Sequence, residues 1–418
     1  MEKNPKVVVV GAGFAGLRAV KELADSGMEV TLIDKNNHHL FQPLLYQVAT
    51  AGLAAEDIVY PLRAVLRKQK NLRFKMAEVL EVDKENRKVV TSNGDVSYDY
   101  LLLAPGAQSN YFGLESVEKN GLGLKDIKEA MVIRNHILKI FESAAQESDE
   151  QTRRAMLTFV IVGGGATGVE CAGGLSELVY LVLAKDYPEI DFSEVRILLI
   201  EGSNRLLGAM PEELSQLAWQ ELKRKKIDVR LEARVTDYDG NTIHLGDGIK
   251  IECKTLIWGA GVRAADLTRR LGAATKSLSR VETNGYLQLP DYPEIFLVGD
   301  SAYFEQDGKP MPMVAPVAIQ QAVVAAKNIK QLVKENPLQE FHYKDPGSMA
   351  TIGRSAAVVN LGRWHFGGLI AWVLWLVVHL FQIIGFRNRI LVVINWAWDY
   401  FLFERAVRVI DPEGKNRT

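Results

Sequence analysis

Two glycine-rich loops contain the residues whose types and spacing point most clearly to chemistry. The first loop reads Gly11-Ala12-Gly13-Phe14-Ala15-Gly16, and the second reads Gly163-Gly164-Gly165-Ala166-Thr167-Gly168. The first glycine of such a loop allows a tight turn, the second lets the backbone approach a pyrophosphate, and the third lets a helix pack closely on a strand. The helix that follows offers free amides to the phosphates. Each loop therefore predicts a bound dinucleotide, and the chain is expected to bind two.

Both loops are expected to lie between a buried strand and a helix. Residues 6–10 form a β-branched run that predicts a strand, residues 14–26 have helical spacing, and residues 29–34 predict a second strand. The pattern returns with strands at residues 157–162 and 195–200 and a helix through about residue 183. The sequence thus predicts two βαβ units.

Each unit ends in an acidic residue, Asp34 in the first and Glu201 in the second. A carboxylate at this point accepts hydrogen bonds from ribose hydroxyl groups. Glu201 would suit a free 2′-hydroxyl and repel a 2′-phosphate, which favours NADH over NADPH, although the nearby Arg205 could soften that preference.

Three later strand ends indicate which loop holds a flavin. The predicted strands are residues 101–104, leading to Pro105-Gly106; residues 255–258, leading to Gly259-Ala260-Gly261; and residues 294–298, leading to Gly299-Asp300. A carboxylate at Asp300 can accept hydrogen bonds from the hydroxyl groups of a ribityl chain. Each strand end alone is as readily an ordinary turn, but their order along the chain favours FAD at the first loop and NADH at the second.

Composition and cysteine usage argue against several classes of protein. The net charge of the 418 residues is −1, so there is no basic field to attract nucleic acid. Cys171 and Cys253 lie far apart and outside any C-x-x-C spacing, which argues against a disulfide framework or a metal site and for two buried structural thiols. The first residues lack the features of a secretory signal, so we expect the catalytic body on the cytoplasmic side.

The C-terminal region is apolar and rich in tryptophan. Residues 364–386 contain no Asp, Glu, Lys or Arg, residues 390–403 are nearly as apolar, and Arg387 and Arg389 lie between them. Five of the seven tryptophans lie here, at Trp364, Trp372, Trp375, Trp396 and Trp398. Aromatic residues beside arginines favour a bilayer interface, so we expect two helices lying in one leaflet. A membrane-spanning helix and a dimer interface remain alternatives, since about 20 apolar residues suffice to span.

The order of these elements resembles the two-dinucleotide-binding-domain flavoproteins, in which an NAD(P)H domain interrupts an FAD domain. Residues 36–53 (NNHHLFQPLLYQVATAGL) are similar to the segment that follows the flavin ribose acid in type II NADH dehydrogenases. Residues 314–322 (VAPVAIQQA) are similar to the start of that family's helix beside the flavin ring. The resemblance covers nearly the whole chain. It implies an enzyme that passes a hydride from NADH to FAD and two electrons to a quinone, at a membrane and without proton pumping.

The resemblance also implies a domain order and a set of site residues. The expected fold is α/β, with two Rossmann-like domains, the NADH domain inserted in the FAD domain, and a C-terminal amphipathic helical membrane-anchoring segment. The expected boundaries are 1–120 and 256–345 for the FAD domain, 121–255 for the NADH domain and 346–418 for the anchor. The FAD site is expected to use Gly11, Gly13, Phe14, Ala15, Gly16, Asp34, Lys35, Gln42, Pro43, Ala104, Pro105, Gly106, Asp300 and Ala318. The NADH site is expected to use Gly163, Gly165, Ala166, Thr167, Gly168, Glu201 and Gly261. The expected partners are a quinone, membrane lipids and a second copy of the chain, at the cytoplasmic face of the cell membrane.

Three residues are expected at the quinone end. Glu170 matches a family carboxylate between the nicotinamide and quinone regions, where it would support the reaction by electrostatics or proton relay. An alternative is that Glu170 only complements the dipole of its helix. Gln320 and Gln321 match later positions of the helix motif, but Ala315-Pro316 replaces the Ala-Gln pair with which many family members begin it.

Other functions share some of these features. Disulfide reductases and sulfide:quinone oxidoreductases need cysteines beside the flavin, which two lone cysteines serve poorly. Another NAD(P)H-dependent flavin reductase remains open. From a different class, a non-catalytic redox sensor docked on membranes would carry the same two fingerprints.

Overall fold

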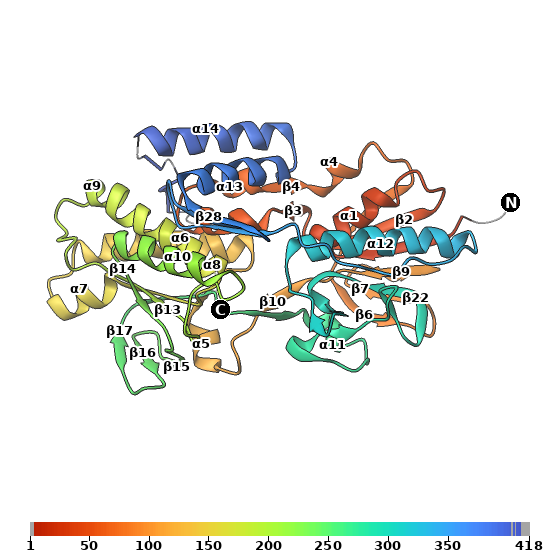
Figure 1. The fold of residues 1–418 in the computed structure, drawn as a ribbon, viewed down its shortest axis with the longest axis horizontal. Coiled ribbons are helices and arrows are strands. Elements are labelled where there is room, and N and C mark those ends of the chain that lie inside the picture. Colours follow the sequence, from red (N-terminus) through yellow and green to blue (C-terminus); the bar gives the residue numbers. More distant parts are fainter. Residues whose placement is uncertain (1–3, 403, 406, 411–418) are drawn as a thin grey trace. The chain divides into compact units, whose positions relative to one another are not determined.

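The chain folds into two compact units, each assembled from three stretches of sequence (Figure 1). A computed structural model describes residues 4–402, 404–405 and 407–410. The first unit comprises Met1–Leu40, Val59–Gln108 and Val262–Pro346, and the second comprises Phe41–Ile58, Ser109–Gly261 and Gly347–Thr418. The predicted boundaries at residues 120, 255 and 345 stay a prediction. The mixed α/β architecture is confirmed.

The first unit is built on a six-stranded sheet in the order β21-β22-β9-β1-β2-β5. Its strands are β1 (Lys6–Val10), β2 (Glu29–Asp34), β5 (Leu72–Met76), β9 (Tyr100–Leu103), β21 (Gln288–Leu289) and β22 (Tyr292–Leu297). The central strand β1 runs parallel to β2 and β9, with Val10 paired to Ile33 and to Leu103. The carboxyl ends of β1, β9 and β22 therefore meet at one edge, where parallel sheets commonly bind ligands.

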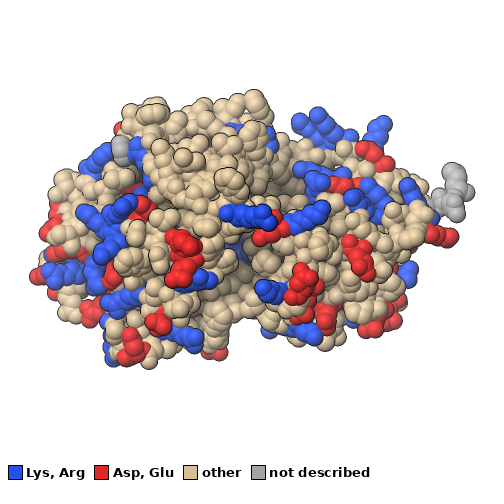
Figure 2. Space-filling model, in the orientation of Figure 1, with Lys and Arg blue, Asp and Glu red and all other residues tan. Residues whose placement is uncertain are grey.

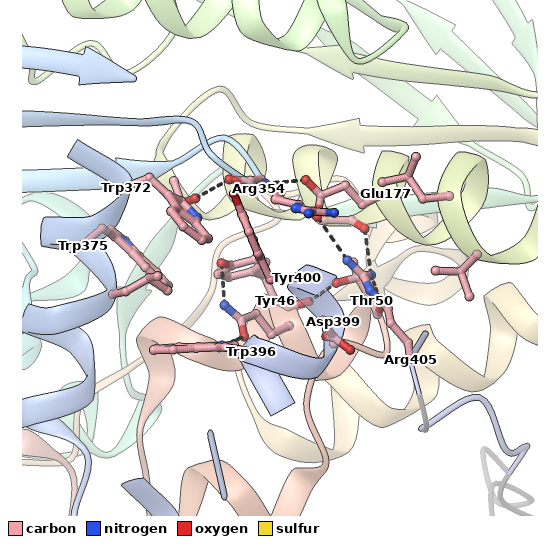
Figure 3. Close-up of a pocket in the computed structure, with 18 residues that line it drawn as sticks. Tyr46, Thr50, Glu177, Arg354, Trp372, Trp375, Trp396, Asp399, Tyr400 and Arg405 are labelled. Carbon is pink, nitrogen blue, oxygen red and sulfur yellow. Dashed lines mark hydrogen bonds and ion pairs between the residues drawn. The ribbon is translucent and has the colours of Figure 1, made fainter. Parts of the chain in front are cut away.

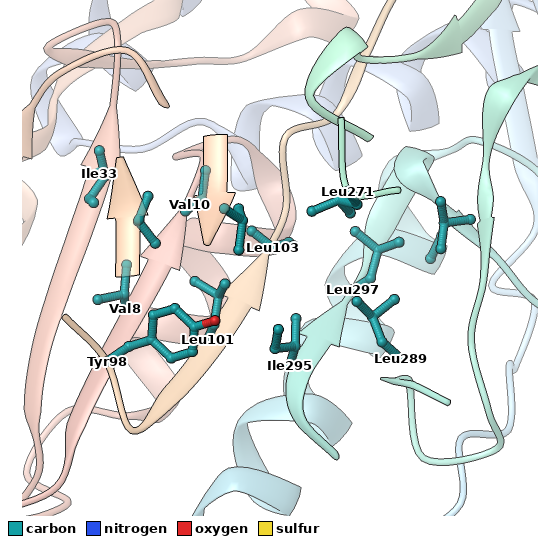
Figure 4. Close-up of a cluster of buried hydrophobic side chains, with 14 of the residues drawn as sticks. Val8, Val10, Ile33, Tyr98, Leu101, Leu103, Leu271, Leu289, Ile295 and Leu297 are labelled. Carbon is teal, nitrogen blue, oxygen red and sulfur yellow. The ribbon is translucent and has the colours of Figure 1, made fainter. Parts of the chain in front are cut away.

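The two faces of this sheet are covered by different elements. Alternate strand residues such as Val8, Leu101 and Ile295 enter one buried cluster (Figure 4), which also contains Val82 and Val89. The latter two come from β6 (Val79–Asp83) and β7 (Lys88–Thr91), which with β8 (Val96–Ser97) form a small antiparallel sheet. Helices α1 (Phe14–Glu22) and α12 (Ala315–Val333) pack against each other in the same unit. Successive side chains of a strand point to opposite faces of the sheet, so each strand contributes to the packing on both faces.

The second unit contains a five-stranded parallel sheet in the order β11-β18-β12-β13-β14. Its strands are β11 (Leu122–Gly123), β12 (Thr158–Val162), β13 (Arg196–Ile200), β14 (Ile227–Arg230) and β18 (Thr255–Trp258). The accompanying helices include α6 (Ile127–Ala144), α7 (Glu150–Met156), α8 (Ala166–Glu177) and α10 (Glu212–Arg224). A three-stranded antiparallel sheet is formed by β15 (Val235–Tyr238), β16 (Thr242–Leu245) and β17 (Lys250–Glu252). Both predicted βαβ units are thus present.

Two helix ends differ from the prediction. Helix α1 ends at Glu22 rather than near residue 26, since Asp25 and Gly27 both have positive φ. The second helix is α-helical only to Glu177 and continues as a π-helical segment, η2 (Leu178–Leu183), followed by α9 (Ala184–Asp186). Such wide turns often occur at functional sites.

The C-terminal part of the second unit is a small sheet followed by two helices. The strands β26 (Ser348–Thr351), β27 (Ala357–Leu361) and β28 (Trp364–Gly368) are antiparallel, and α13 (Leu369–Gln382) and α14 (Phe386–Leu402) follow. Two helices were expected, but the expectation that the apolar run is helical from Trp364 is wrong. Residues 364–368 pair with β27 as a strand, which an apolar run alone cannot distinguish from a helix.

Neither C-terminal helix qualifies as a membrane span. The 14 residues of α13 reach about 21 Å, against a hydrocarbon core of about 30 Å. Within the described residues, only Ala166–Asp186 is long and apolar enough to cross a membrane, and 72% of its apolar window is buried inside the protein. That segment is the core helix after the second glycine loop.

Candidate functional site

The first glycine loop connects β1 to α1 at the carboxyl edge of the sheet. Gly11 has φ +91°, and a Cβ there would collide with the carbonyl of Ala104. A Cβ at Gly16 would collide with the carbonyl of Gly11, whereas the space around Gly13 is open. The glycines therefore do what the spacing predicts: two permit close packing, and Gly13 leaves room for a ligand in front of the helix.

Asp34 closes this loop from the neighbouring strand. The amide of Ala12 donates to Oδ2 at 2.6 Å, and the amide of Asn36 donates to Oδ1 at 2.7 Å. Burial raises the pKa of Asp34, and the two backbone hydrogen bonds oppose that rise. Each carboxyl oxygen keeps a further lone pair, as binding a ribose requires.

The loop after β22 lies against the same edge. Asp300 sits in a short 3-10 turn, η4 (Gly299–Ser301), and the hydroxyl of Ser301 donates to the carbonyl of Gly106 at 2.7 Å. A Cβ at Gly299 would stand 3.5 Å from Ala318 and 3.6 Å from Ala15. The structure thus brings together predicted FAD residues from four separate stretches of the chain.

Three other predicted FAD residues, Lys35, Gln42 and Pro43, are not in contact with these loops in the interactions described above. Lys35 follows Asp34 at the end of β2. Gln42 and Pro43 begin a short helical turn, η1 (Gln42–Leu44), that belongs to the second unit. Their part in binding FAD stays a prediction.

His39 is a residue that the sequence analysis missed. Its Nδ1 lies 2.9 Å from the carbonyl oxygen of Ala12, and its ring meets that of Phe14 edge-on at 5.3 Å. Only 3% of the side chain is exposed, and burial lowers its pKa. A neutral imidazole with the proton on Nδ1 donates to the loop and holds it in shape. The one sequence signal was its place within the family-like segment.

The second glycine loop repeats this geometry between β12 and α8. A Cβ at Gly163, which has φ +113°, would collide with the carbonyl of Gly259. The amide of Gly164 donates to Glu201 Oε2 at 2.5 Å, and the amide of Ser203 donates to Oε1 at 2.7 Å. Gly165, the first residue before α8, has open space around it. Glu201 therefore closes the second loop as Asp34 closes the first.

The surroundings of this loop also fit a ligand. Gly165, Ala166 and Thr167 are exposed at the start of α8, while Gly168 is buried against the strand. Gly261 follows β18 with the ring of Phe112 beside it. The guanidinium of Arg205 donates to the carbonyl of Gly208 at 2.7 Å, so in this structure it serves its own loop.

Glu170 lies on α8 beyond its first turn, which contains no acidic residue. Its side chain is buried, and the amide of Thr351 donates to Oε1 at 3.2 Å. Burial raises the pKa of Glu170 to about 8, against the smaller lowering effects of Thr351 and Trp375. The carboxyl is therefore protonated at neutral pH and has no charge with which to complement the helix dipole. The helix-dipole interpretation does not hold at that pH.

Gln320 and Gln321 are both engaged within the first unit. Gln321 is buried, and its Oε1 accepts from the amide of Gly299 at 2.7 Å. Gln320 donates to the carbonyl of Lys344 at 2.8 Å and accepts from the amide of the same residue at 3.0 Å. Gln321 thus positions the turn that carries Asp300. A role for either glutamine at the quinone end stays a prediction.

A cavity lies one to two turns further along α8 (Figure 3). Its walls come from α8, α13, α14, the loop after β26, Arg405, and a helix at residues 45–49, α2 (Leu45–Ala49). Trp372 and Trp375 lie at one side of it, and the ion pair of Glu177 and Arg405 lies at the other. Sequence analysis did not find this cavity, because no local pattern links its walls.

The two cysteines are buried in the second unit. Cys171 and Cys253 are buried and free, and burial raises the pKa of each to about 12. Among the residues that the structure describes, no group of three or more His, Cys, Asp or Glu side chains could hold a metal ion. A thiol-based reductase mechanism would need accessible thiolates, which these two residues do not provide.

Comparison with known proteins gives consistent matches. Residues 5–322 match the pyridine nucleotide-disulphide oxidoreductase family, and residues 346–406 match the NDH2 C-terminal domain. The chain is 38% identical, over 100% of its length and 92% of the relative's, to type II NADH:quinone oxidoreductase Ndh of Mycobacterium tuberculosis. It is 40% identical to NdhA of the same organism, over 94% of this chain and 86% of NdhA.

Solved structures show the same fold. NDH2 from Plasmodium falciparum in complex with NADH superimposes with a TM-score of 0.89 at 20% identity, covering 98% of this chain and 100% of that one. The sulfide:quinone oxidoreductase of Aquifex aeolicus superimposes with a TM-score of 0.72 at 20% identity, covering 95% of each chain.

Proposed function

The chain belongs to the type II NADH:quinone oxidoreductases, and from this premise we propose that it oxidises NADH through FAD and reduces a quinone at a membrane surface, without pumping protons. The observation that carries the proposal is the repeated loop geometry. Ala12 binds Asp34 and Gly164 binds Glu201 through the same amide-to-carboxylate hydrogen bond, so the chain has two prepared dinucleotide sites. FAD, when bound, supplies the two-electron redox chemistry.

The first unit has the residues to hold FAD. The start of α1 at Gly13 offers amides and a partial positive charge to a pyrophosphate. Asp34 would accept from the adenosine ribose, and Asp300, on the turn after β22, would accept from the ribityl chain. His39 and Gln321 hold the two loops from behind.

The second unit has the residues to hold NADH. Gly165, Ala166 and Thr167 are exposed at the start of α8, where they would meet a pyrophosphate, and Glu201 would accept from the ribose 2′-hydroxyl. A 2′-phosphate would meet a carboxylate already held in place by two amides, so NADH is favoured over NADPH. Hydride transfer then needs no side-chain nucleophile.

Two C-terminal helices support association with a membrane. On α13, the buried residues Ala371, Trp375 and His379 form one stripe, while Ile370 and Phe381 on the other side are exposed by 75% and 69%. A helix that is apolar on its exposed face needs an apolar environment there. Figure 2 shows a broad area over α13 and α14 in which charged side chains are sparse.

Two asparagines of helix α14 face the protein. Asn388 donates to the carbonyls of Glu56 and Asp57, and Asn395 donates to the carboxylate of Asp57 at 2.9 Å. Two large apolar residues of α14, Phe386 and Phe401, are more than two-thirds exposed. The polar residues that interrupt the apolar run thus dock the helix, and we propose that its outer face enters one leaflet at the cytoplasmic side. A homodimer through the same region remains a proposal.

The proposed function is tested by two anaerobic half-reactions. Purified protein containing FAD is mixed with NADH while the flavin absorbance is followed, and a soluble quinone is then added. The enzyme is expected to bleach rapidly and to recover its colour when the quinone is added. A flavin that stays oxidised in NADH would overturn the proposal and favour a non-catalytic sensor, whereas bleaching without recovery would point to an acceptor other than a quinone.

A further inference from the structure

Quinone reduction creates a demand for protons that the buried part of the site must meet. Oxidation of NADH supplies two electrons and one hydrogen nucleus, whereas a quinol needs two electrons and two protons. Each turnover of the proposed reaction therefore consumes one proton from solvent. Glu170 can hold a proton at neutral pH, but its side chain is only 8% exposed. A buried donor of this kind needs a route by which it regains its proton.

The cavity beside α8 reaches the immediate surroundings of Glu170. Thr351, whose amide donates to Glu170, lines the cavity, and so does Trp375. The indole N–H of Trp375 is buried and makes no hydrogen bond of standard geometry within the described residues, although it is near enough to lower the pKa of Glu170. Tyr46 lines the cavity as well, and the charge of Glu170 contributes to raising its pKa. These groups form the inner end of the cavity.

The side of the cavity opposite Trp375 contains Glu177 and Arg405, and Asp399 also lines the cavity. Arg405 pairs with Glu177 at 3.2 Å and donates to the carbonyls of Thr50 and Gly174, and Lys225 also pairs with Glu177 at 2.8 Å. Glu177 is thus the ion-pair partner of both Arg405 and Lys225.

Of the two carboxyl groups that line the cavity, Glu177 is held in ion pairs, and Asp399 is therefore better suited to exchange protons with water. Burial raises the pKa of Asp399 to about 7; the charge of Arg405 opposes this rise, and the charge of Glu177 adds a smaller one. The guanidinium of Arg354, also on the cavity wall, stacks over the ring of Tyr400 at 4.0 Å. Asp399 thus binds and releases protons in the pH range in which Glu170 must be supplied.

The cavity has room for water. Its volume is about 90 Å³. A water molecule occupies about 30 Å³ in the liquid, so about three fit. Tyr46, Gln47, Thr50 and Thr351 line the cavity together with Trp375 and Asp399, and their polar groups can hold such waters in a chain.

We propose that this cavity is the proton-uptake path of the enzyme, with Asp399 as its outer carboxyl and Glu170 as its inner one. The inference rests on the proposed quinone reduction and deepens it. The Glu170 carboxyl gives its proton to a quinone oxygen and becomes a carboxylate. That carboxylate takes a proton from cavity water, the water regains it from the Asp399 carboxyl, and Asp399 regains it from solvent. One proton moves inward per quinol formed, and no electrons pass through the path.

The test is the variant Asp399→Asn in the full-length protein containing FAD. Flavin bleaching by NADH is expected to stay within about twofold of wild type, because hydride transfer needs no solvent proton. Quinone-dependent recovery of the flavin is expected to slow roughly tenfold or more at pH 8, and less at pH 6, where protons are more available. Sodium formate, a small weak acid that fits the cavity, is expected to restore rate, whereas sodium chloride at equal ionic strength is not.

Two further variants serve as controls. Asp399→Glu keeps a carboxyl in the cavity and is expected to retain most of the rate. Glu404→Gln removes a carboxylate from an exposed position nearby that does not line the cavity, and its kinetics are expected to match wild type. Flavin content shows whether each variant is folded, and the Asp399→Glu variant tests the path even where Asp399→Asn folds poorly.

The possible outcomes distinguish failure of the proposed proton-uptake path from failure of the proposed NADH:quinone activity. Unchanged recovery and pH dependence in Asp399→Asn would overturn the proposed path while wild type still reduced quinone. A higher KM for quinone with unchanged kcat and no response to formate would also overturn it, by showing that the cavity binds substrate. Failure of wild-type protein to pass electrons from NADH to quinone would instead overturn the proposed function.

Discussion

The carboxylate of Glu201 accepts a hydrogen bond of 2.5 Å from the amide of Gly164, inside the loop that Glu201 closes. The ribose acid and the phosphate-binding loop are therefore one mechanical unit. A change at Glu201 alters both the contact with the ribose and the shape of the loop.

Replacing Glu201 with Gln is expected to lower kcat/KM for NADH about tenfold or more, since the charge-assisted hydrogen bonds from Gly164 and Ser203 are weakened. Activity with NADPH should fall less, because the repulsion of a 2′-phosphate is removed as well. Steady-state kinetics with both nucleotides measure the ratio. An unchanged ratio would contradict the ribose role of Glu201.

Replacing His39 with Ala is expected to weaken FAD binding. The carbonyl of Ala12 would lose its buried donor, at a cost of about 1–3 kcal/mol. The flavin retained after dialysis, and the increase in Tm produced by added FAD, report the loss. His38→Ala is the matched control, because His38 is a neighbouring imidazole that hydrogen-bonds only to Asn37 among the described contacts. Equal flavin retention in the two variants would show that His39 does not hold the loop.

Glu170 is expected to make stability depend on pH. In the folded protein its pKa is raised to about 8, so between about pH 4.5 and pH 8 the folded state keeps a proton that the unfolded state has released. Its contribution to stability is fully present below that range and is lost as the pH rises through it, by up to about 1.4 kcal/mol per pH unit. Urea unfolding at several pH values should show a steeper decline for wild type than for Glu170→Gln. Parallel curves would mean that Glu170 is ionised in the folded protein.

Replacing Ile370 or Phe381 with Glu is expected to weaken binding to lipid vesicles, because each exposed side chain would lose about 1.5–3 kcal/mol of apolar transfer free energy. Partitioning should fall roughly tenfold or more for each variant, as measured by co-sedimentation with the vesicles. Met76→Glu is the control, since Met76 is 53% exposed and belongs to the first unit, whereas the C-terminal helices belong to the second. Binding that is equally weak, or equally unaffected, in all three variants would contradict the membrane-facing role of α13.

Much of the cofactor-binding framework follows from local sequence. Positive φ at Gly11 and Gly163, apolar runs for buried parallel strands and acids at the strand ends are requirements met within one βαβ unit. Short-range sterics and hydrogen bonding decide such features, so they are visible in the order of residues. The predicted strand at residues 29–34 accordingly matches β2 residue for residue.

The C-terminal region shows where local pattern is insufficient. Apolarity at residues 364–368 was compatible with helix or strand, and pairing with β27 decided for a strand. The polar residues of α14 looked like interruptions of a membrane-facing run, but contacts with residues near Asp57 turn them inward. In both cases the deciding partner lies elsewhere in the chain.

The sequence by itself predicted two bound dinucleotides, the loop that takes each, and an apolar, tryptophan-rich C-terminal region, because glycine spacing, strand period and hydropathy act over a few residues. Only the tertiary structure decided the state of Glu170, since burial of that carboxyl and its contact with Thr351 depend on a segment 181 residues away. The cavity that joins Tyr46, Glu177, Asp399 and Arg405 is likewise a product of packing. Desolvation and through-space charge have no signature in local sequence, and they set the protonation on which the proposed chemistry depends.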